Sequence, residues 1–173
     1  KLTDLANTGD LVIVDSLDAA FQELADLVER VHQKGLLAKV GLDPVGVALI
    51  VDALAERKIG GEHDPTADRV VGVSQGYKLS GTIKTAEVQL SEKRLVHSGQ
   101  HLMSWCVGNA KVEPKGNATV ITKQASGTAK IDPLMATFNA IALMAQNPEP
   151  PRKTSVYEAL ARARAAENKA NAA

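Results

Sequence analysis

The sequence predicts an α/β fold, because short apolar runs typical of buried strands alternate with segments of helical periodicity. The first half contains, in order, a strand at 11–14, a helix over 17–31, a strand at 38–42, a helix over 47–54 and a strand at 69–73. Consecutive strands joined by helices form parallel sheets with right-handed crossovers. We therefore expect a parallel sheet covered by helices.

Polar and small residues mark the ends of these elements. Asp15 and Ser16 suit the cap of the first helix, and Gly35 suits a left-handed end to it. The second strand ends at Asp43-Pro44, and the second helix should stop before Gly60-Gly61. Each boundary therefore has a local chemical cause.

The second half has a different pattern. It contains a helical pattern at 79–90, a shorter segment at 100–108, a hairpin with arms at 110–113 and 118–122, and an apolar helix at 132–145. Pro114-Lys-Gly-Asn117 supplies the turn chemistry of the hairpin. Prolines at 148, 150 and 151 end the last helix. We predict one domain over 1–147 and a tail over 148–173 that is an exposed helix or disordered.

Composition limits the possible functions. The 173 residues suffice for one domain with a core, and the 20 basic and 20 acidic residues cancel, so any contact with nucleic acid must come from a local patch. The single cysteine, Cys106, excludes an internal disulfide and favours a buried small side chain. No apolar run is long enough to span a membrane, and no phosphate-binding loop of the ATPase type occurs. ATP hydrolysis is therefore expected in another region or protein.

Two carboxylates occupy positions where chemistry is common. Asp43 follows the second predicted strand and Asp132 begins the last predicted helix. The carboxyl ends of strands are where open α/β sheets usually bind ligands. Both residues also have a structural explanation, since Asp-Pro starts turns and aspartate favours helix N-termini. Periodicity alone leaves both readings open.

Six segments of the sequence, taken in the order in which they occur, bear on the role of these two acids. They are Lys39-Val-Gly-Leu-Asp-Pro44, Gly81-Thr-Ile-Lys-Thr-Ala-Glu87, Leu95-Val-His97, Gly108-Asn-Ala110, Lys123, and Lys130-Ile-Asp-Pro-Leu-Met-Ala136 with Asn139-Ala140 beyond it. From about Leu11 to Met144 this order resembles the C-terminal nuclease domain of terminase large subunits from tailed phages or prophages. The resemblance implies an RNase H-like mixed sheet flanked by helices. The opening strands, which carry the family's first metal-binding acid, have no counterpart here, so the chain is expected to lack them.

The resemblance also implies chemistry. The family cuts concatemeric double-stranded DNA during genome packaging, and Asp43 and Asp132 match two of its catalytic and metal-binding acids. Mg²⁺ or Mn²⁺ prefers carboxylate oxygens, and two such ions about 3.5 to 4 Å apart activate water and stabilise the leaving oxygen. Implied partners are double-stranded DNA, the terminase ATPase domain, the small terminase subunit and the portal protein. The implied location is the cytoplasm of the bacterial host, with no membrane association.

Lesser candidates surround the two acids. Lys123 and Lys130 could contact DNA phosphates beside the metals, or be ordinary surface lysines. Asn109 could orient a ligand, or end a helix in the left-handed conformation that asparagine tolerates. Asp15 is a weak substitute for the absent acid and more naturally begins a helix.

Two other functions stay open. The chain could be a catalytically inert docking or regulatory fragment, such as a prophage remnant, in which both acids are structural. It could also be an RNase H-like resolvase or integrase, which would use the same metals on branched DNA. The order of the motifs favours the terminase over both, although the fold alone would not.

Overall fold

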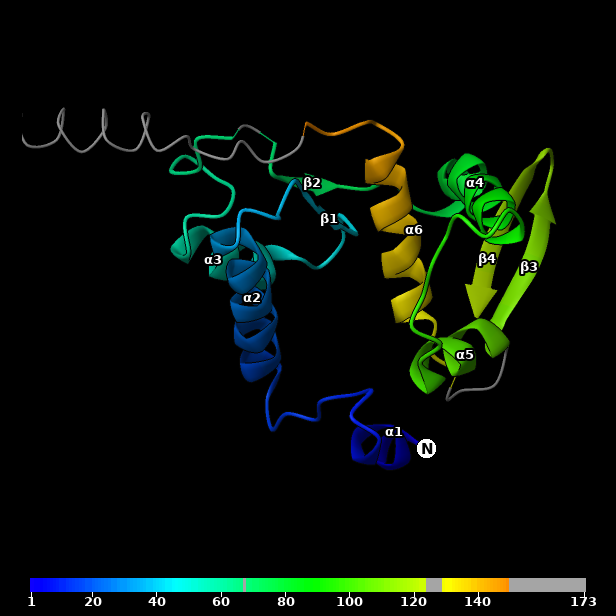
Figure 1. The fold of residues 1–173 in the computed structure, drawn as a ribbon, viewed down its shortest axis with the longest axis horizontal. Coiled ribbons are helices and arrows are strands. Elements are labelled where there is room, and N and C mark those ends of the chain that lie inside the picture. Colours follow the sequence, from blue (N-terminus) through cyan, green and yellow to red (C-terminus); the bar gives the residue numbers. More distant parts are fainter. Residues whose placement is uncertain (67, 124–128, 150–173) are drawn as a thin grey trace, which may run out of the picture.

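A computed structural model describes residues 1–66, 68–123 and 129–149. It confirms the predicted α/β class (Figure 1). The elements in chain order are α1 Leu2–Asn7, α2 Leu17–Gln33, β1 Val40–Leu42, α3 Ala48–Glu56, β2 Val70–Gly72, the 3₁₀ helix η1 Gly76–Leu79, α4 Ser80–Ser91, α5 His101–Gly108, β3 Ala110–Lys115, β4 Ala118–Lys123 and α6 Asp132–Met144. Most of the predicted tail lies outside the described residues.

The strands form two separate pairs within the described residues. β1 and β2 are parallel, with Val40 opposite Val70 and Leu42 opposite Gly72. β3 and β4 form the predicted antiparallel hairpin. The parallel pair is the part of the fold that positions Asp43.

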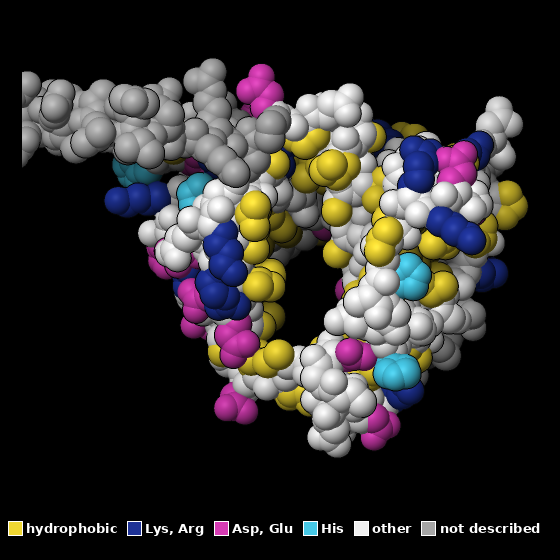
Figure 2. Space-filling model, viewed as in Figure 1, with side chains coloured by type: hydrophobic (Ala, Val, Ile, Leu, Met, Phe, Trp, Pro, Cys, Tyr) yellow, Lys and Arg dark blue, Asp and Glu magenta, His cyan; other side chains and the backbone are white. Residues whose placement is uncertain are grey.

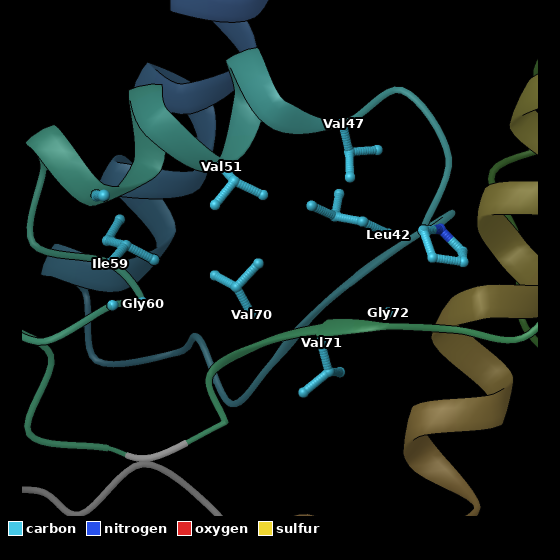
Figure 3. A pocket seen from close by; sticks show the side chains of 11 residues that line it. Leu42, Val47, Val51, Ile59, Gly60, Val70, Val71 and Gly72 are labelled. Atoms are coloured by element: carbon cyan, nitrogen blue, oxygen red, sulfur yellow. The ribbon is translucent and has the colours of Figure 1, made fainter.

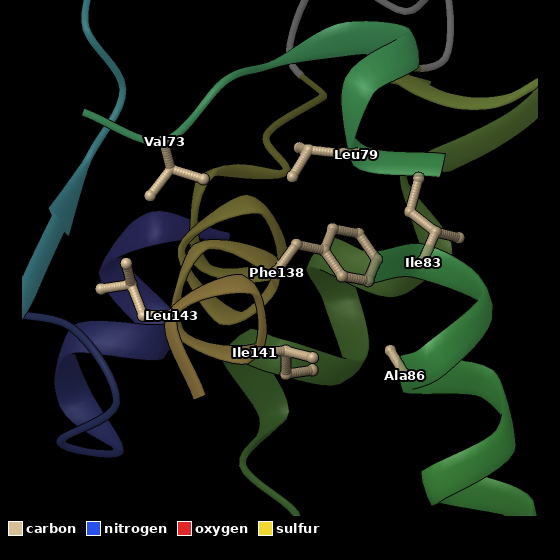
Figure 4. Close-up of a cluster of buried hydrophobic side chains, with 7 residues drawn as sticks. All are labelled: Val73, Leu79, Ile83, Ala86, Phe138, Ile141 and Leu143. Carbon is tan, nitrogen blue, oxygen red and sulfur yellow. The ribbon is translucent and has the colours of Figure 1, made fainter. Parts of the chain in front are cut away.

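Helices cover both faces of the parallel pair, as Figure 1 shows. Successive side chains of a strand point to opposite faces. Val40, Leu42 and Val70 pack against the buried core of α2 and α3. Val71 and Val73 pack on the other face with α4 and α6. Figure 4 shows Val73 in this cluster. The sheet therefore lies between two apolar cores, and α6 is held against it by the second.

The ends of α2 follow the predicted chemistry. The Ser16 hydroxyl oxygen accepts a hydrogen bond from the backbone N–H of Ala19 at 3.1 Å. Gly35, just after the helix, has φ of +65°, which glycine adopts without steric cost. Leu17, Leu24 and Leu27 remain 67%, 45% and 49% exposed. Figure 2 shows an opening in the molecule between α2 and α6, with hydrophobic side chains on its rim.

Two local predictions are wrong. The run 11–14 is not a strand, and Val12 and Ile13 in it are 70% and 63% exposed. A strand needs a neighbour for its backbone hydrogen bonds, and no described strand pairs with this run. Pro114 lies inside β3 rather than in the turn. Its missing N–H is tolerated in β3 because β3 is an edge strand. The turn is formed by Gly116 and Asn117.

Candidate functional site

Asp43 lies at the carboxyl end of β1, as the sequence predicts. The backbone oxygen of Leu42 accepts a hydrogen bond from the N–H of Val73 at 2.7 Å, so β1 and β2 end side by side. Asp43 is exposed, and its Oδ1 accepts a hydrogen bond from the N–H of Val45 at 3.1 Å. That bond forms the turn expected of Asp-Pro, and the second carboxylate oxygen makes no hydrogen bond with another described residue. The same residue thus serves the turn and presents a carboxylate to solvent.

Asp132 is the first residue of α6 and is exposed. The N-cap residue is Ile131, which forms no side-chain cap, and the negative charge of Asp132 in the first turn favours the helix dipole. It lies near α5: burial raises the pKa of the Cys106 thiol, and the negative charge of Asp132 adds to that effect. Cys106 is fully buried, as predicted. The start of α6 therefore places an exposed carboxylate next to a packed part of the core.

Asn109 fixes the segment before Asp132. Its Nδ2 donates a hydrogen bond to the backbone oxygen of Lys130 at 3.0 Å. It ends α5 with φ of −85°, so the expected left-handed conformation is not used. Because Lys130 is two residues before Asp132, this bond ties the end of α5 to the start of α6. Asn109 thus acts on the position of Asp132 through the backbone.

The two candidate lysines are exposed. Lys130 precedes α6, and Lys123 ends β4 opposite Ala110. Neither forms a salt bridge with another described residue. Both side chains are therefore available to an anionic ligand. This exposure agrees with a phosphate-contacting lysine and equally with an ordinary surface lysine.

The structure carries the two acids on different elements. Leu143, near the end of α6, packs against Gly41 of β1, two residues before Asp43. Asp132 begins the same helix, about 16 Å earlier along its axis at the usual helical rise. Among the described residues, no three His, Cys, Asp or Glu side chains lie close enough together to share a metal ion. Asp43 and Asp132 offer the hard oxygen donors that Mg²⁺ or Mn²⁺ prefers, but only part of a ligand set.

A buried ion pair that sequence reasoning missed supports the sheet. Asp64 and Arg69 are 9% and 8% exposed, and the Nε of Arg69 donates to Oδ2 of Asp64. Arg69 also donates through Nη1 to the backbone oxygen of Leu37 at 2.9 Å and through Nη2 to Oγ1 of Thr66 at 2.6 Å. Opposite charges five residues apart in a loop carry no periodic signal, so only the fold reveals this network.

An apolar cavity of about 340 Å³ lies between α3 and the sheet. Figure 3 shows Val51 and Ile59 on one side of it and Val70 on the other. No charged side chain lines this cavity. It therefore offers packing space but no group for acid–base or metal chemistry.

Comparison with known proteins finds one matching family model and a similar solved structure. A family model described as "Terminase large subunit, endonuclease domain" matches residues 5–148. The crystal structure of the HK97 bacteriophage large terminase matches with a TM-score of 0.55 and 15% sequence identity, over 71% of this chain and 24% of that one. This chain thus spans about a quarter of that protein. No curated protein matched in sequence. None of the described helices has the length and apolar character needed to cross a membrane.

Proposed function

The chain belongs to the family of terminase large subunit endonuclease domains, and we propose that it cuts concatemeric double-stranded DNA during viral genome packaging. The family match over residues 5–148, which includes both candidate acids, carries this proposal. The RNase H-like α/β fold shared with a phage large terminase supports it. A match to a terminase model also favours this function over a resolvase or integrase.

Asp43 and Asp132 are the proposed metal ligands. Each carboxylate would contribute a ligand to Mg²⁺ or Mn²⁺, and a pair of such ions would supply an activated water and stabilise the leaving oxygen of the phosphodiester. Because the two acids lie toward opposite ends of α6, about 16 Å apart along its axis, sharing one pair of ions would require them to move closer together. Both side chains are exposed, so neither needs to break a buried contact to bind an ion. Asn109 would keep Asp132 in place through the carbonyl of Lys130.

Lys123 and Lys130 are proposed to contact DNA phosphates near this site. A lysine ammonium attracts phosphate without reading sequence, which suits cutting with little sequence preference. The ATPase domain, the small terminase subunit, the portal protein and the cytoplasm of the bacterial host are the proposed partners and location. The domain is proposed to end near residue 147, before the proline-rich segment.

Conversion of supercoiled plasmid to nicked and linear forms tests the proposal. The chain, and the complete polypeptide encoded by its reading frame, would be assayed with Mn²⁺, Mg²⁺ or EDTA. Asp43→Asn and Asp132→Asn should each abolish cutting by removing a charged metal ligand. Asp52→Asn removes an exposed carboxylate elsewhere and should cut like the parent.

The controls distinguish the loss of a metal ligand from a general loss of negative charge. If the folded parent polypeptide never cuts with either metal, or if Asp43→Asn and Asp132→Asn cut as well as Asp52→Asn, the nuclease proposal fails. The inert docking fragment then becomes the better explanation, with both acids acting as turn and helix residues.

A further inference from the structure

A second cavity, of about 350 Å³, lies at the carboxyl end of β2, on the face of the sheet that α6 and α4 cover. Its lining residues are Val71, Gly72, Val73, Ser74, Lys78, Leu79, Thr82, Ala142, Leu143 and Gln146. The apolar members belong to the core, and Figure 4 shows Val73, Leu79 and Leu143 around the end of α6. The polar members are Ser74, Lys78, Thr82 and Gln146, and none of them has a role in the proposed metal site.

The polar groups of this cavity include several hydrogen-bond donors. Lys78 is exposed and forms no salt bridge with another described residue. The N–H of Val73 bonds to β1, so the N–H and the carbonyl of Gly72 point away from β1. The hydroxyls of Ser74 and Thr82 can also donate. One positive charge and several donors in one hollow suit an oxyanion.

One group of opposite character, the Leu143 carbonyl, is already engaged. α6 ends at this cavity, and the carbonyl ends of helices repel anions. The Leu143 carbonyl, however, accepts a hydrogen bond from the N–H of Gln146 at 3.0 Å. No acidic residue lines the cavity. Among the residues that line the cavity, Lys78 is therefore the only charged one.

The cavity shares an edge of the sheet with Asp43. Leu42 of β1 is bonded to Val73 of β2, so Asp43 and Ser74 are each one residue beyond a hydrogen-bonded pair. Neighbouring strands lie about 4.8 Å apart. A ligand in the cavity would therefore lie close to whatever Asp43 binds.

The charge distribution along the chain agrees with an anionic ligand here. Residues 1–73 contain 13 acidic and 7 basic residues, whereas residues 74–132 contain 4 acidic and 8 basic residues. The zero net charge of the chain thus hides an acidic part and a basic part. Ser74, Lys78 and Thr82 belong to the basic part of the sequence.

We propose that this cavity binds a phosphate group, with Lys78 as the cationic contact and the hydroxyls of Ser74 and Thr82 as donors. On the proposed function, which this inference deepens, the group is a backbone phosphate of the DNA held beside Asp43. A small phosphate compound would use the same chemistry. The two sources are distinguished by titrating each separately.

The first test uses ¹⁵N-labelled chain and records amide chemical shifts without metal. Inorganic phosphate and a short DNA duplex are titrated separately. Binding should shift the amides of Gly72, Ser74 and Thr82, and Lys78→Ala should abolish these shifts. If only inorganic phosphate shifts them, the cavity serves a small compound. If neither ligand shifts them, the proposal is overturned.

The second test measures the affinity for duplex DNA in EDTA at several salt concentrations. Loss of one phosphate contact should lower the slope of log K against log salt by about 1. Lys78→Ala should show that change and Lys78→Arg should restore it. Lys84→Ala removes an exposed lysine that does not line the cavity, and should match the parent.

The outcomes separate this inference from the nuclease proposal. Binding is measured without metal, so a chain that fails to cut can still show the Lys78 effect with inorganic phosphate. A chain that cuts, but whose phosphate and DNA binding are the same in Lys78→Ala and Lys84→Ala, overturns the cavity proposal and leaves the nuclease proposal intact.

Discussion

Replacing Asp64 with asparagine should destabilise the protein by about 3 kcal/mol, the lower end of the cost of breaking one partner of a buried ion pair. Asp64 accepts three hydrogen bonds: from the N–H of Gly60 at 2.8 Å, from the N–H of Thr66 at 2.8 Å, and from Arg69. Both carboxylate oxygens are used. An asparagine amide turns one oxygen into a donor, which then opposes another donor, and it leaves the buried Arg69 guanidinium without a counter-charge.

Urea unfolding followed by circular dichroism at pH 7 measures this effect. A loss of about 3 kcal/mol corresponds to a fall in Tm of roughly 6 to 12 °C for a domain of this size. Asp68→Asn is the matched control, because Asp68 is exposed and asparagine tolerates its φ of +58°. A loss in Asp64→Asn within about 0.5 kcal/mol of that in Asp68→Asn would refute the reasoning.

The same substitution should change the pH dependence of stability. Burial alone would raise the pKa of Asp64, but the hydrogen bonds from Arg69, Gly60 and Thr66, together with the charge of Arg69, hold it below its ordinary value of 3.8. A carboxyl whose pKa is lowered by folding stabilises the fold above its unfolded pKa. That stabilisation is lost as the pH falls through the folded pKa. The difference between the parent and Asp64→Asn should therefore shrink below about pH 3.8.

Three further changes test packing around the site. Gly41→Ala should destabilise the fold by about 1 to 3 kcal/mol in urea, because its Cβ would meet a leucine methyl of α6 at 2.8 Å, whereas Gly81→Ala, with nothing within 4 Å, should not. Cys106 should react with a thiol reagent much more slowly in the folded chain than in urea, since burial excludes the reagent and raises the pKa of the thiol; equal rates would contradict the buried placement. Asn109→Ala should cost about 1 kcal/mol by removing the bond to Lys130, and should slow plasmid cutting without changing DNA affinity in EDTA.

The sequence predicted the elements whose causes are local. α2 begins after Ser16 and ends before Gly35 because a cap and a left-handed glycine act within a few residues. The strand around Val40–Leu42 and the hairpin were predicted for similar reasons. The run 11–14 was predicted wrongly, because an apolar run becomes a strand only beside another strand. Sequence alone cannot supply that neighbour.

The candidate site also contains residues whose positions the sequence predicted and residues that it did not predict. Asp43 and Asp132 were placed correctly at a strand end and a helix start, since both positions follow from neighbouring residues. Their roles as metal ligands stay proposals. The donor set around Lys78 was not predicted, because it joins residues from η1, from α4 and from the segments that follow β2 and α6. A serine and a glycine directly after a strand, at Ser74 and Gly76, were the available signal.

Two features outside the proposed metal ligands fix where Asp43 lies. The backbone oxygen of Arg69 accepts a hydrogen bond from the N–H of Val40 at 2.7 Å. The side chain of Arg69 donates a hydrogen bond to the backbone oxygen of Leu37, just before β1. A slip of β1 by one residue would exchange its faces and drive the Leu42 side chain toward Leu143, where even a methyl group on Gly41 does not fit. The buried ion pair and the glycine therefore select one register. That register sets Asp43 beside the end of β2.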